Sequence, residues 1–267
     1  MPDILDEIVA YKREFVEHIT RVRSLADIKK NLSEVPPPPS FADAIRRTAD
    51  GPLNVIAEVK KASPSKGIIR EDFDPVYIAE NYAEHGASAI SVLTDEHFFK
   101  GSLDYLRQIR KVVPQTPLLR KDFTIGEYQI YEAREAGASA VLLIAGVLDK
   151  YQLVDFRELA SSLGMDALTE VHSEKEADMV AESGARIIGI NNRNLKTFEV
   201  DLAQTQRVMK LLGAPLPGYI FIGESAIKDP DDAEVISGYG VDAILVGESL
   251  MKLKEPGTGI PALRGLA

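Results

Sequence analysis

The sequence predicts an α/β protein of the (β/α)8, or TIM, barrel class, with residues 1–267 forming one domain and residues 1–50 an N-terminal helical extension of it. The first observation is a recurring sequence pattern, which consists of a helix end, a glycine suited to terminate the helix, and a short apolar strand. The copies are residues 84–92 (EHGASAISV), 135–143 (EAGASAVLL), 182–190 (ESGARIIGI) and 238–246 (GYGVDAILV). Their glycines, at 86, 137, 184 and 240, are 51, 47 and 56 residues apart. A strand–helix unit needs roughly half such an interval, so each interval should hold two.

The second observation is that apolar segments occur where this rhythm requires additional strands. They are residues 54–60, 117–121, 165–170 and 218–223, which bring the predicted strands to eight. Helical periodicity lies between strands, for example over residues 77–83 and 148–156. A doubly wound open sheet is the alternative, but it usually carries a glycine-rich loop after its first strand, and residues 58–67 contain one glycine.

The N-terminal extension stands outside the repeat. Its first segment predicts an amphipathic helix whose apolar stripe is interrupted by Lys12; the stripe comprises Ile4, Leu5, Ile8, Phe15, Val16 and Ile19. Four prolines at 36–39 predict an extended spacer, and a second short helix is expected over about 41–48. These patterns alone leave open whether the extension closes the barrel floor or lies near the active site.

Composition excludes several classes of function. Of the 267 residues, 45% are hydrophobic and 27% charged, as in ordinary globular proteins, and no apolar run approaches the ~18 residues of a membrane span. The first residues show no signal peptide, and the absence of cysteine excludes disulfides and thiolate chemistry, so a cytoplasmic location is expected. The net charge of −10 argues against a nucleic-acid partner, although a few converging cations could still bind a small anion. The four histidines lack metal-ligand spacing, so no metal is expected.

Charged and small polar residues collect where the predicted strands end, which is where active sites of this fold lie. Packing would favour apolar residues at these places, so one shared site at the barrel mouth is the natural interpretation. The residues are Glu58 and Lys60 after the first strand, Thr94 and Asp95 after the second, Arg120, Lys121 and Asp122 at the third, Glu170 at the fifth, Asn191 and Arg193 at the sixth, Glu224 and Ser225 at the seventh, and Gly247, Glu248 and Ser249 at the eighth.

Two subsites can be separated within this set. The turns at 223–226 and 247–249, together with Ser63 in the first loop, predict a phosphate site, because backbone N–H groups at helix starts bind anions. The alternative is ordinary helix capping by Ser225 and Ser249. The other subsite gathers opposite charges that could serve as acids and bases; it consists of Glu58, Lys60, Lys121, Glu170 and Asn191.

Three functions are compatible with a barrel mouth that carries these lysines and carboxylates. A lysine could form a Schiff base with a carbonyl substrate, as in class I aldolases. The lysines could instead remain ammonium ions that donate protons and hold anions, which neighbouring carboxylates favour because they raise a lysine's pKa. The third function is a non-catalytic barrel that binds a phosphate ligand, and the convergence of charged strand ends argues against it.

Six short segments, in order along six strands, resemble the indole-3-glycerol phosphate synthase family of tryptophan biosynthesis. They are residues 56–65 (IAEVKKASPS), 119–123 (LRKDF), 168–172 (LTEVH), 188–195 (IGINNRNL), 223–225 (GES) and 246–251 (VGESLM). Thr169 and Phe15 depart from the family pattern without touching a proposed role. The resemblance implies that the extension lies over the barrel mouth. Many bacteria fuse this barrel to a following phosphoribosylanthranilate isomerase barrel, but only 16 residues follow Met251, so we expect no fused isomerase barrel in this chain.

The resemblance also implies a substrate, 1-(2-carboxyphenylamino)-1-deoxyribulose 5-phosphate, whose ring closure, decarboxylation and dehydration need no cofactor or metal. Lys121 then matches the general acid and Glu170 the general base, while Lys60 matches the residue that binds the substrate carboxylate. The division of acid roles between the two lysines stays open. The remaining matches are Glu58 and Asn191 as orienting residues, Arg193, Glu224 and Ser225 as supporting and substrate-binding residues, and Ser63, Gly247 and Glu248 as the phosphate site.

Overall fold

The computed structural model describes residues 4–194 and 199–266, and its centre is a closed barrel of eight parallel strands. Each strand lies within two residues of its predicted position, and closure of the sheet excludes the doubly wound alternative. In spatial order the strands are β1 (Asn54–Val59), β10 (Ala243–Val246), β9 (Ile220–Glu224), β8 (Ile187–Asn191), β7 (Asp166–Val171), β6 (Ala140–Ile144), β5 (Leu118–Lys121) and β4 (Ala89–Leu93), which pairs with β1 again.

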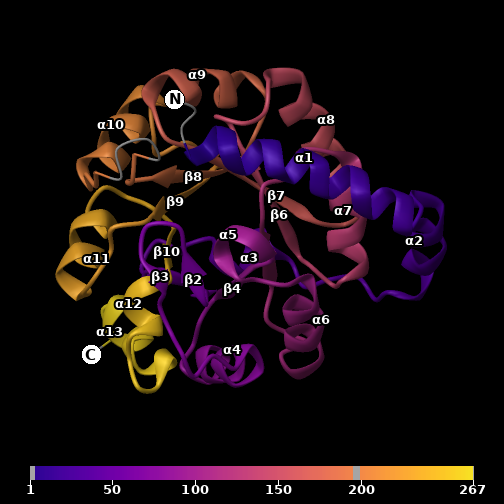
Figure 1. The fold of residues 1–267 in the computed structure, drawn as a ribbon. Helices are drawn as coiled ribbons and strands as arrows, with labels where there is room; N and C mark the ends of the chain where they lie inside the picture. The colour runs from indigo at the N-terminus through magenta and orange to yellow at the C-terminus, as the bar shows by residue number, and fades with distance from the viewer. Residues whose placement is uncertain (1–3, 195–198, 267) are drawn as a thin grey trace.

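Helices alternate with the strands and surround the barrel (Figure 1). The predicted helix-ending glycines all have positive φ, 85° at Gly86, 90° at Gly137, 76° at Gly184 and 89° at Gly240, a conformation that favours glycine. The main helices are α4 (Pro75–Glu84), α6 (Leu103–Val112), α7 (Glu127–Glu135), α8 (Lys150–Ser162), α9 (Glu174–Glu182), α10 (Ala203–Leu211) and α11 (Pro230–Ser237). Shorter elements in the loops are β2 (Ala62–Ser63), β3 (Gly67–Ile68), α5 (Glu96–Phe99), α12 (Glu248–Met251), η2 (Pro256–Gly259) and α13 (Ile260–Leu263).

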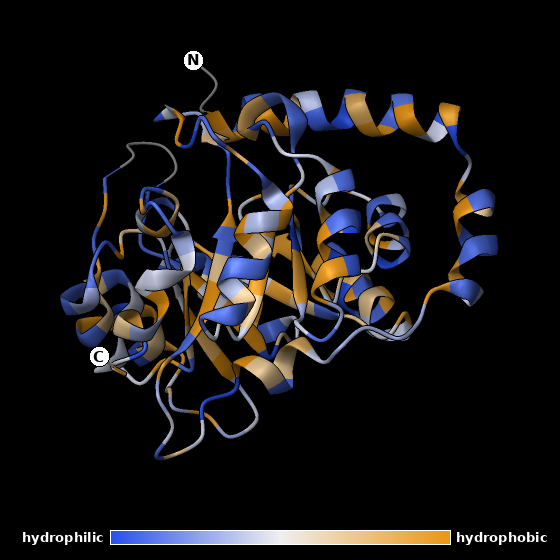
Figure 2. Ribbon diagram, turned by 90° about the horizontal axis from the view of Figure 1, so that it is seen from below, coloured by the Kyte–Doolittle hydropathy of each residue, from blue (hydrophilic) through white to orange (hydrophobic). Residues whose placement is uncertain are grey.

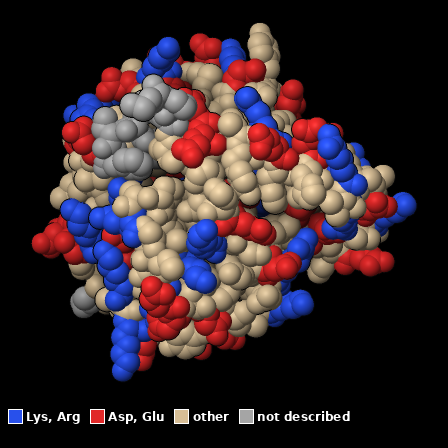
Figure 3. All heavy atoms as spheres, in the orientation of Figure 1, with Lys and Arg blue, Asp and Glu red and all other residues tan. Residues whose placement is uncertain are grey.

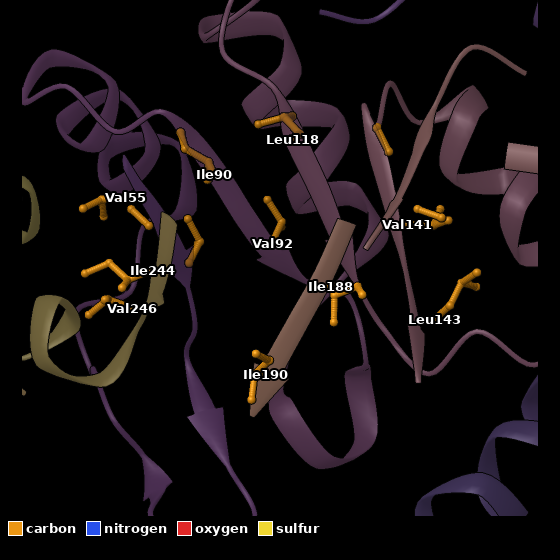
Figure 4. Close-up of a cluster of buried hydrophobic side chains, with 14 of the residues drawn as sticks. Val55, Ile90, Val92, Leu118, Val141, Leu143, Ile188, Ile190, Ile244 and Val246 are labelled. Carbon is orange, nitrogen blue, oxygen red and sulfur yellow. The ribbon is translucent and has the colours of Figure 1, made fainter. Parts of the chain in front are cut away.

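Alternation along each strand separates two hydrophobic cores. Outward side chains pack against the helices, as Figure 4 shows for residues such as Val55, Val141 and Ile190. Inward side chains such as Ile56, Leu119 and Ile222 fill the barrel itself. The same alternation directs the strand-end polar residues Glu58, Lys121, Glu170, Asn191 and Glu224 to the inner face, in phase with the barrel core.

The N-terminal extension runs from one end of the barrel to the other. Helix α1 (Ile4–Val22) crosses the mouth, as the two views in Figures 1 and 2 agree, and its Ile4, Leu5 and Ile8 line the cavity there. Helix α2 (Leu25–Asn31) and η1 (Leu32–Glu34) follow along α7, where Arg23 forms an ion pair with Glu135. Helix α3 (Phe41–Ile45) then packs into the opposite end of the barrel.

The extension therefore occupies both of the positions that the sequence left open. Its first helix, α1, lies over the barrel mouth, and its last helix, α3, closes the barrel floor. The sequence reasoning missed α2, and α3 is shorter than the predicted 41–48. It ends early because the backbone turns extended at Arg46, and the N–H of Arg47 then donates to the carboxylate of Asp242, just before β10. The N–H of Ala42 likewise donates to Asp166, at the start of β7, which fixes α3 at the floor.

Within residues 4–194 and 199–266, no helix is both long and apolar enough to cross a membrane. Figure 3 shows one face of the molecule, on which lysines and arginines are interspersed with aspartates and glutamates.

Candidate active site

A cavity of about 800 Å³ opens at the carboxyl ends of the strands, beneath α1. It is lined by every residue that the family resemblance matched to a catalytic, substrate-binding or phosphate-binding role: Glu58, Lys60, Ser63, Lys121, Glu170, Asn191, Arg193, Glu224, Ser225, Gly247 and Glu248. The fold thus brings together residues that are up to 190 positions apart in the sequence. Leu195, at the end of one of the motifs, lies outside the described residues.

Lys121 lies at the centre of the polar cluster. Its Nζ is 2.5 Å from Glu170 Oε2 and 2.9 Å from Glu224 Oε2, and both carboxylates are buried. Burial disfavours the ammonium form, but the attraction of Glu170, Glu224 and Glu58 outweighs it and raises the pKa of Lys121 above its ordinary value. Lys121 is therefore a protonated, precisely held cation across the physiological pH range.

The opposite charges after the first strand form an ion pair. Lys60 Nζ is 3.2 Å from Glu58 Oε2, and the ammonium also lies 5.9 Å from the centroid of the Phe99 ring. The Glu58 side chain is 6% exposed and that of Lys60 is 21% exposed. Lys60 can therefore contact a ligand in the cavity while the more deeply buried Glu58 fixes the position of the Lys60 ammonium group.

Two glycines leave room for these carboxylates. A Cβ on Gly189, in β8, would lie 1.9 Å from Glu224 Oε1, and a Cβ on Gly247 would lie 2.5 Å from Glu58 Oε2. Gly247 was predicted as part of a phosphate site, whereas the role of Gly189 in making space could not be inferred from the sequence. Close approach of a side chain to the backbone is a common reason for glycine within a strand.

The loops after β1, β9 and β10 form one polar end of the cavity. Ser63 lies there in the β2–β3 hairpin, which follows β1, the neighbour of β10 in the barrel, and Ser225 and Ala226 have positive φ of 63° and 66°. Such strained backbone in non-glycine residues occurs mainly at functional sites. Lysines missed by the sequence reasoning also line this end: Lys66, Lys228 and Lys252.

Ser225 and Ser249 do not act as helix caps here, contrary to the alternative interpretation. Asp229 caps α11, and α12 begins after Gly247 without a side-chain cap. Ser249 instead donates to the carbonyl of Ile227, which ties the two loops together. Glu248 directs its carboxylate to Lys252, at 2.6 Å, so its backbone rather than its side chain is the part suited to an anion.

The other end of the cavity is apolar. Leu142 and Ile144 belong to β6, which lies across the barrel from β10 and β1. Ile4, Leu5 and Ile8 of α1, with Phe99 and Phe123, complete this end, and the two phenylalanine rings are 6.1 Å apart. The cavity therefore suits a ligand with an aromatic group at one end and an anionic group at the other.

Some charged strand-end residues do not enter the cavity as expected. Arg120 alternates with Lys121 and points outward, where it pairs with Glu132 of α7 and with Asp122. Asp95 caps α5. Asp95 and Asp122 both pair with Lys12 of α1, at 2.7 and 2.8 Å, so the residue that interrupts the apolar stripe is a buried anchor for the helix.

The fold and this site define the class of (β/α)8 barrel enzymes, and the paired lysines and carboxylates at the mouth are groups suited to acid–base chemistry. In the described part of the chain no group of three or more histidines, aspartates or glutamates is arranged to hold a metal ion.

The sequence profile of the indole-3-glycerol phosphate synthase family matches residues 5–263, and the chain belongs to this family. The indole-3-glycerol phosphate synthase of Polaromonas sp. is 45% identical over 267 residues, which cover 100% of both chains. That of Acetivibrio thermocellus is 47% identical over 254 residues, covering 94% of this chain and 95% of the relative. A crystal structure of 3-hexulose-6-phosphate synthase shares the fold alone, with a TM-score of 0.61 and 14% identity over 80% of this chain and 99% of its own.

Proposed function

We propose that this protein is an indole-3-glycerol phosphate synthase, which closes the pyrrole ring of 1-(2-carboxyphenylamino)-1-deoxyribulose 5-phosphate and releases CO2 and water. Family membership supports this reaction, and the observation that carries it is the two-ended cavity. The substrate has a carboxylated aromatic ring at one end and a phosphate at the other, which match the apolar and polar ends of the cavity. The reacting ketone then falls between them, beside Lys121.

In this proposal the buried ion cluster supplies the proton transfers. The aromatic carbon that bears the carboxylate attacks the ketone carbon, and the Lys121 ammonium donates a proton to the developing oxyanion. Loss of CO2 is followed by departure of the hydroxyl as water, for which a proton must be removed from the ring. Glu170, hydrogen-bonded to Lys121 and Asn191, serves as the base, and Lys60 binds the substrate carboxylate.

The phosphate is proposed to bind in the loops at the polar end. Ser63 and Ser225 contribute hydroxyl groups, and the backbone at Gly247 and Glu248 contributes N–H donors. Arg193, whose backbone N–H donates to Asn191 Oδ1 at 3.0 Å, also lines the cavity. The surroundings of Lys121 argue against the Schiff-base alternative, because a lysine nucleophile must be a neutral amine, and the neighbouring carboxylates, Glu170 foremost, favour its ammonium form.

The test is to incubate the protein with the carboxyphenylamino substrate and to follow indole fluorescence. We expect turnover by the parent protein and by an exposed control variant, Lys111→Met, and a fall in kcat of about 10²–10⁴-fold in Lys121→Met and Glu170→Gln. Absence of indole at high enzyme concentration would refute the function, and near-parental kcat in either site variant would refute that residue's role. A covalent adduct trapped by borohydride on Lys121 or Lys60 would instead support the Schiff-base reaction.

A further inference from the structure

The ion cluster at the barrel mouth has more negative than positive groups. Three buried carboxylates, Glu58, Glu170 and Glu224, meet two lysines, Lys60 and Lys121. If all five were ionised, one negative charge would be left without a partner in a site of low exposure. A buried unpaired carboxylate is costly, so a further cation or a bound proton must offset it.

His172 provides a third cationic group at the edge of this cluster. Its Nε2 is 2.9 Å from Glu170 Oε1, the oxygen that does not contact Lys121. Its Nδ1 is 3.5 Å from Glu176 Oε2, and the same oxygen accepts the backbone N–H of His172 at 2.7 Å. The ring, 10% exposed, therefore bridges the strand-end carboxylate of β7 and a carboxylate of α9.

The groups around the ring favour its protonated form. In the described part of the chain, the titratable groups that face it are Glu170 from β7 and Glu176 from α9, while Asn191 of β8 adds a neutral amide 3.3 Å from Nε2. Burial disfavours the imidazolium, but hydrogen bonds to Glu170 and Glu176 outweigh this effect and raise the pKa of His172 to about 9.

The two carboxylates that share Lys121 consequently differ in their partners. Glu170 has Lys121, His172 and the Asn191 amide, which donates to Oε1 at 3.1 Å. Glu224 has Lys121 at Oε2, whereas its buried Oε1 accepts no hydrogen bond from a described residue.

We propose that His172 is a positioning residue whose positive charge, shared between Glu170 and Glu176, keeps Glu170 ionised. With Glu176 included, four carboxylates face three cations, so one negative charge is still in excess, and Glu224, whose Oε1 has no hydrogen-bond partner among the described residues, takes up a proton. Burial works against ionisation of both groups, but the pKa of Glu170 is held well below its ordinary value by Lys121 and His172. The pKa of Glu224 is raised by burial and by the nearby Glu170, which Lys121 only partly offsets. Two carboxyl groups on one ammonium are thereby sorted into a base and a proton carrier.

The catalytic consequence rests on the proposed function, because it takes Glu170 as the base. The charge on His172 does not, and it can be measured by NMR without substrate. We expect the His172 ring nitrogens of the parent protein to report an imidazolium up to about pH 9. In Glu176→Gln and in Glu170→Gln the titration midpoint should fall by about 1 unit or more, because each variant removes one neighbouring carboxylate.

Kinetics then tests the effect on Glu170. His172→Gln keeps a hydrogen-bond donor but removes the charge, and His18→Gln is a matched change of an exposed histidine on α1. We expect the acid limb of the pH profile of kcat/KM to move upward by about 1 unit or more in His172→Gln, since Glu170 loses a cation, and to stay in place in His18→Gln.

Three outcomes would overturn the proposal: a parental His172 ring that titrates near its ordinary 6.5, a midpoint that neither carboxylate variant moves, or an acid limb left in place by His172→Gln while activity falls equally at every pH. The NMR titration also decides the matter if His172→Gln does not fold. If the imidazolium is found but no indole forms, the proposed function fails while the charge assignment stands.

Discussion

At the scale of single residues, the site depends on small differences between like groups. Glu170 and Glu224 bind the same ammonium ion, yet Glu170 has two further polar partners, whereas Glu224 has a buried oxygen with no hydrogen-bond partner among the described residues. Gly189 is part of this difference, because its missing side chain is what allows the Glu224 carboxyl group to lie against β8. The backbone of β8 thus helps to position the carboxyl group of Glu224, which belongs to the neighbouring strand β9.

This role of Gly189 gives a prediction with a matched control. In Gly189→Ala the new Cβ would stand 1.9 Å from Glu224 Oε1, so the carboxyl group must leave Lys121. Overpacking of this kind typically costs about 1–3 kcal/mol, and we expect kcat in the indole assay to fall at least about tenfold. Gly126→Ala, which meets nothing within 4 Å and has φ of −161°, should keep parental kcat. Equal kcat in the two variants would contradict the prediction.

At the scale of elements, α1 forms a wall of the cavity and is anchored by a buried ion network. Lys12 is 2% exposed and joins Asp95, which follows β4, to Asp122, which directly follows Lys121. Asp122 in turn contacts Thr94 and Arg120, and Arg120 reaches Glu132 of α7. The network therefore connects the helix above the mouth to the strand that carries the proposed general acid.

Removing this anchor should both destabilise the protein and loosen the site. Lys12→Met leaves Asp95 and Asp122 buried without their shared cation, and breaking one partner of a buried pair typically costs about 3–5 kcal/mol. Because Ile4, Leu5 and Ile8 line the cavity from α1, we expect KM to rise more than kcat falls. Urea unfolding and indole kinetics measure the two effects. The neighbouring exposed variant, Arg13→Met, is the control and should change neither; an undiminished stability of Lys12→Met would contradict the anchor.

At the scale of the whole molecule, the barrel and the site could be predicted because their signals are local. A glycine with positive φ ends the helix in each copy of the recurring helix–glycine–strand pattern. Alternation along a strand then determines which side chains face the inside of the barrel. The contacts of Lys12 and His172 could not be predicted in this way. Lys12 pairs with residues 83 and 110 positions away along the chain. From the sequence alone, a lysine in an apolar stripe only interrupts the pattern, because its ion-pair partners are known only once the tertiary structure is known. His172 was visible within a motif, but the contact of its Nδ1 with Glu176 depends on how α9 packs.

The buried network also makes the stability of the whole fold depend on pH. Burial of Asp122 opposes ionisation, but Lys12 and Arg120 outweigh it and lower the pKa of Asp122 from 3.8 to about 2. A carboxyl group with a depressed pKa in the folded state stabilises that state above its unfolded pKa, and the contribution disappears as the pH falls through the folded pKa. Between about pH 4 and 2 the fold should therefore lose roughly 2 kcal/mol from this group alone.

The variant Asp122→Asn isolates this contribution, because the remaining acidic groups are common to both proteins. It leaves Lys12 with Asp95 alone, so we expect lower stability than the parent at pH 7. Its stability should then fall less steeply than the parent's below pH 4, since position 122 no longer binds a proton on unfolding. Urea midpoints at pH 7, 4 and 2.5 for both proteins provide the comparison. Parallel curves with a constant offset would show that Asp122 titrates normally in the folded state, and that the ion network does not hold its charge.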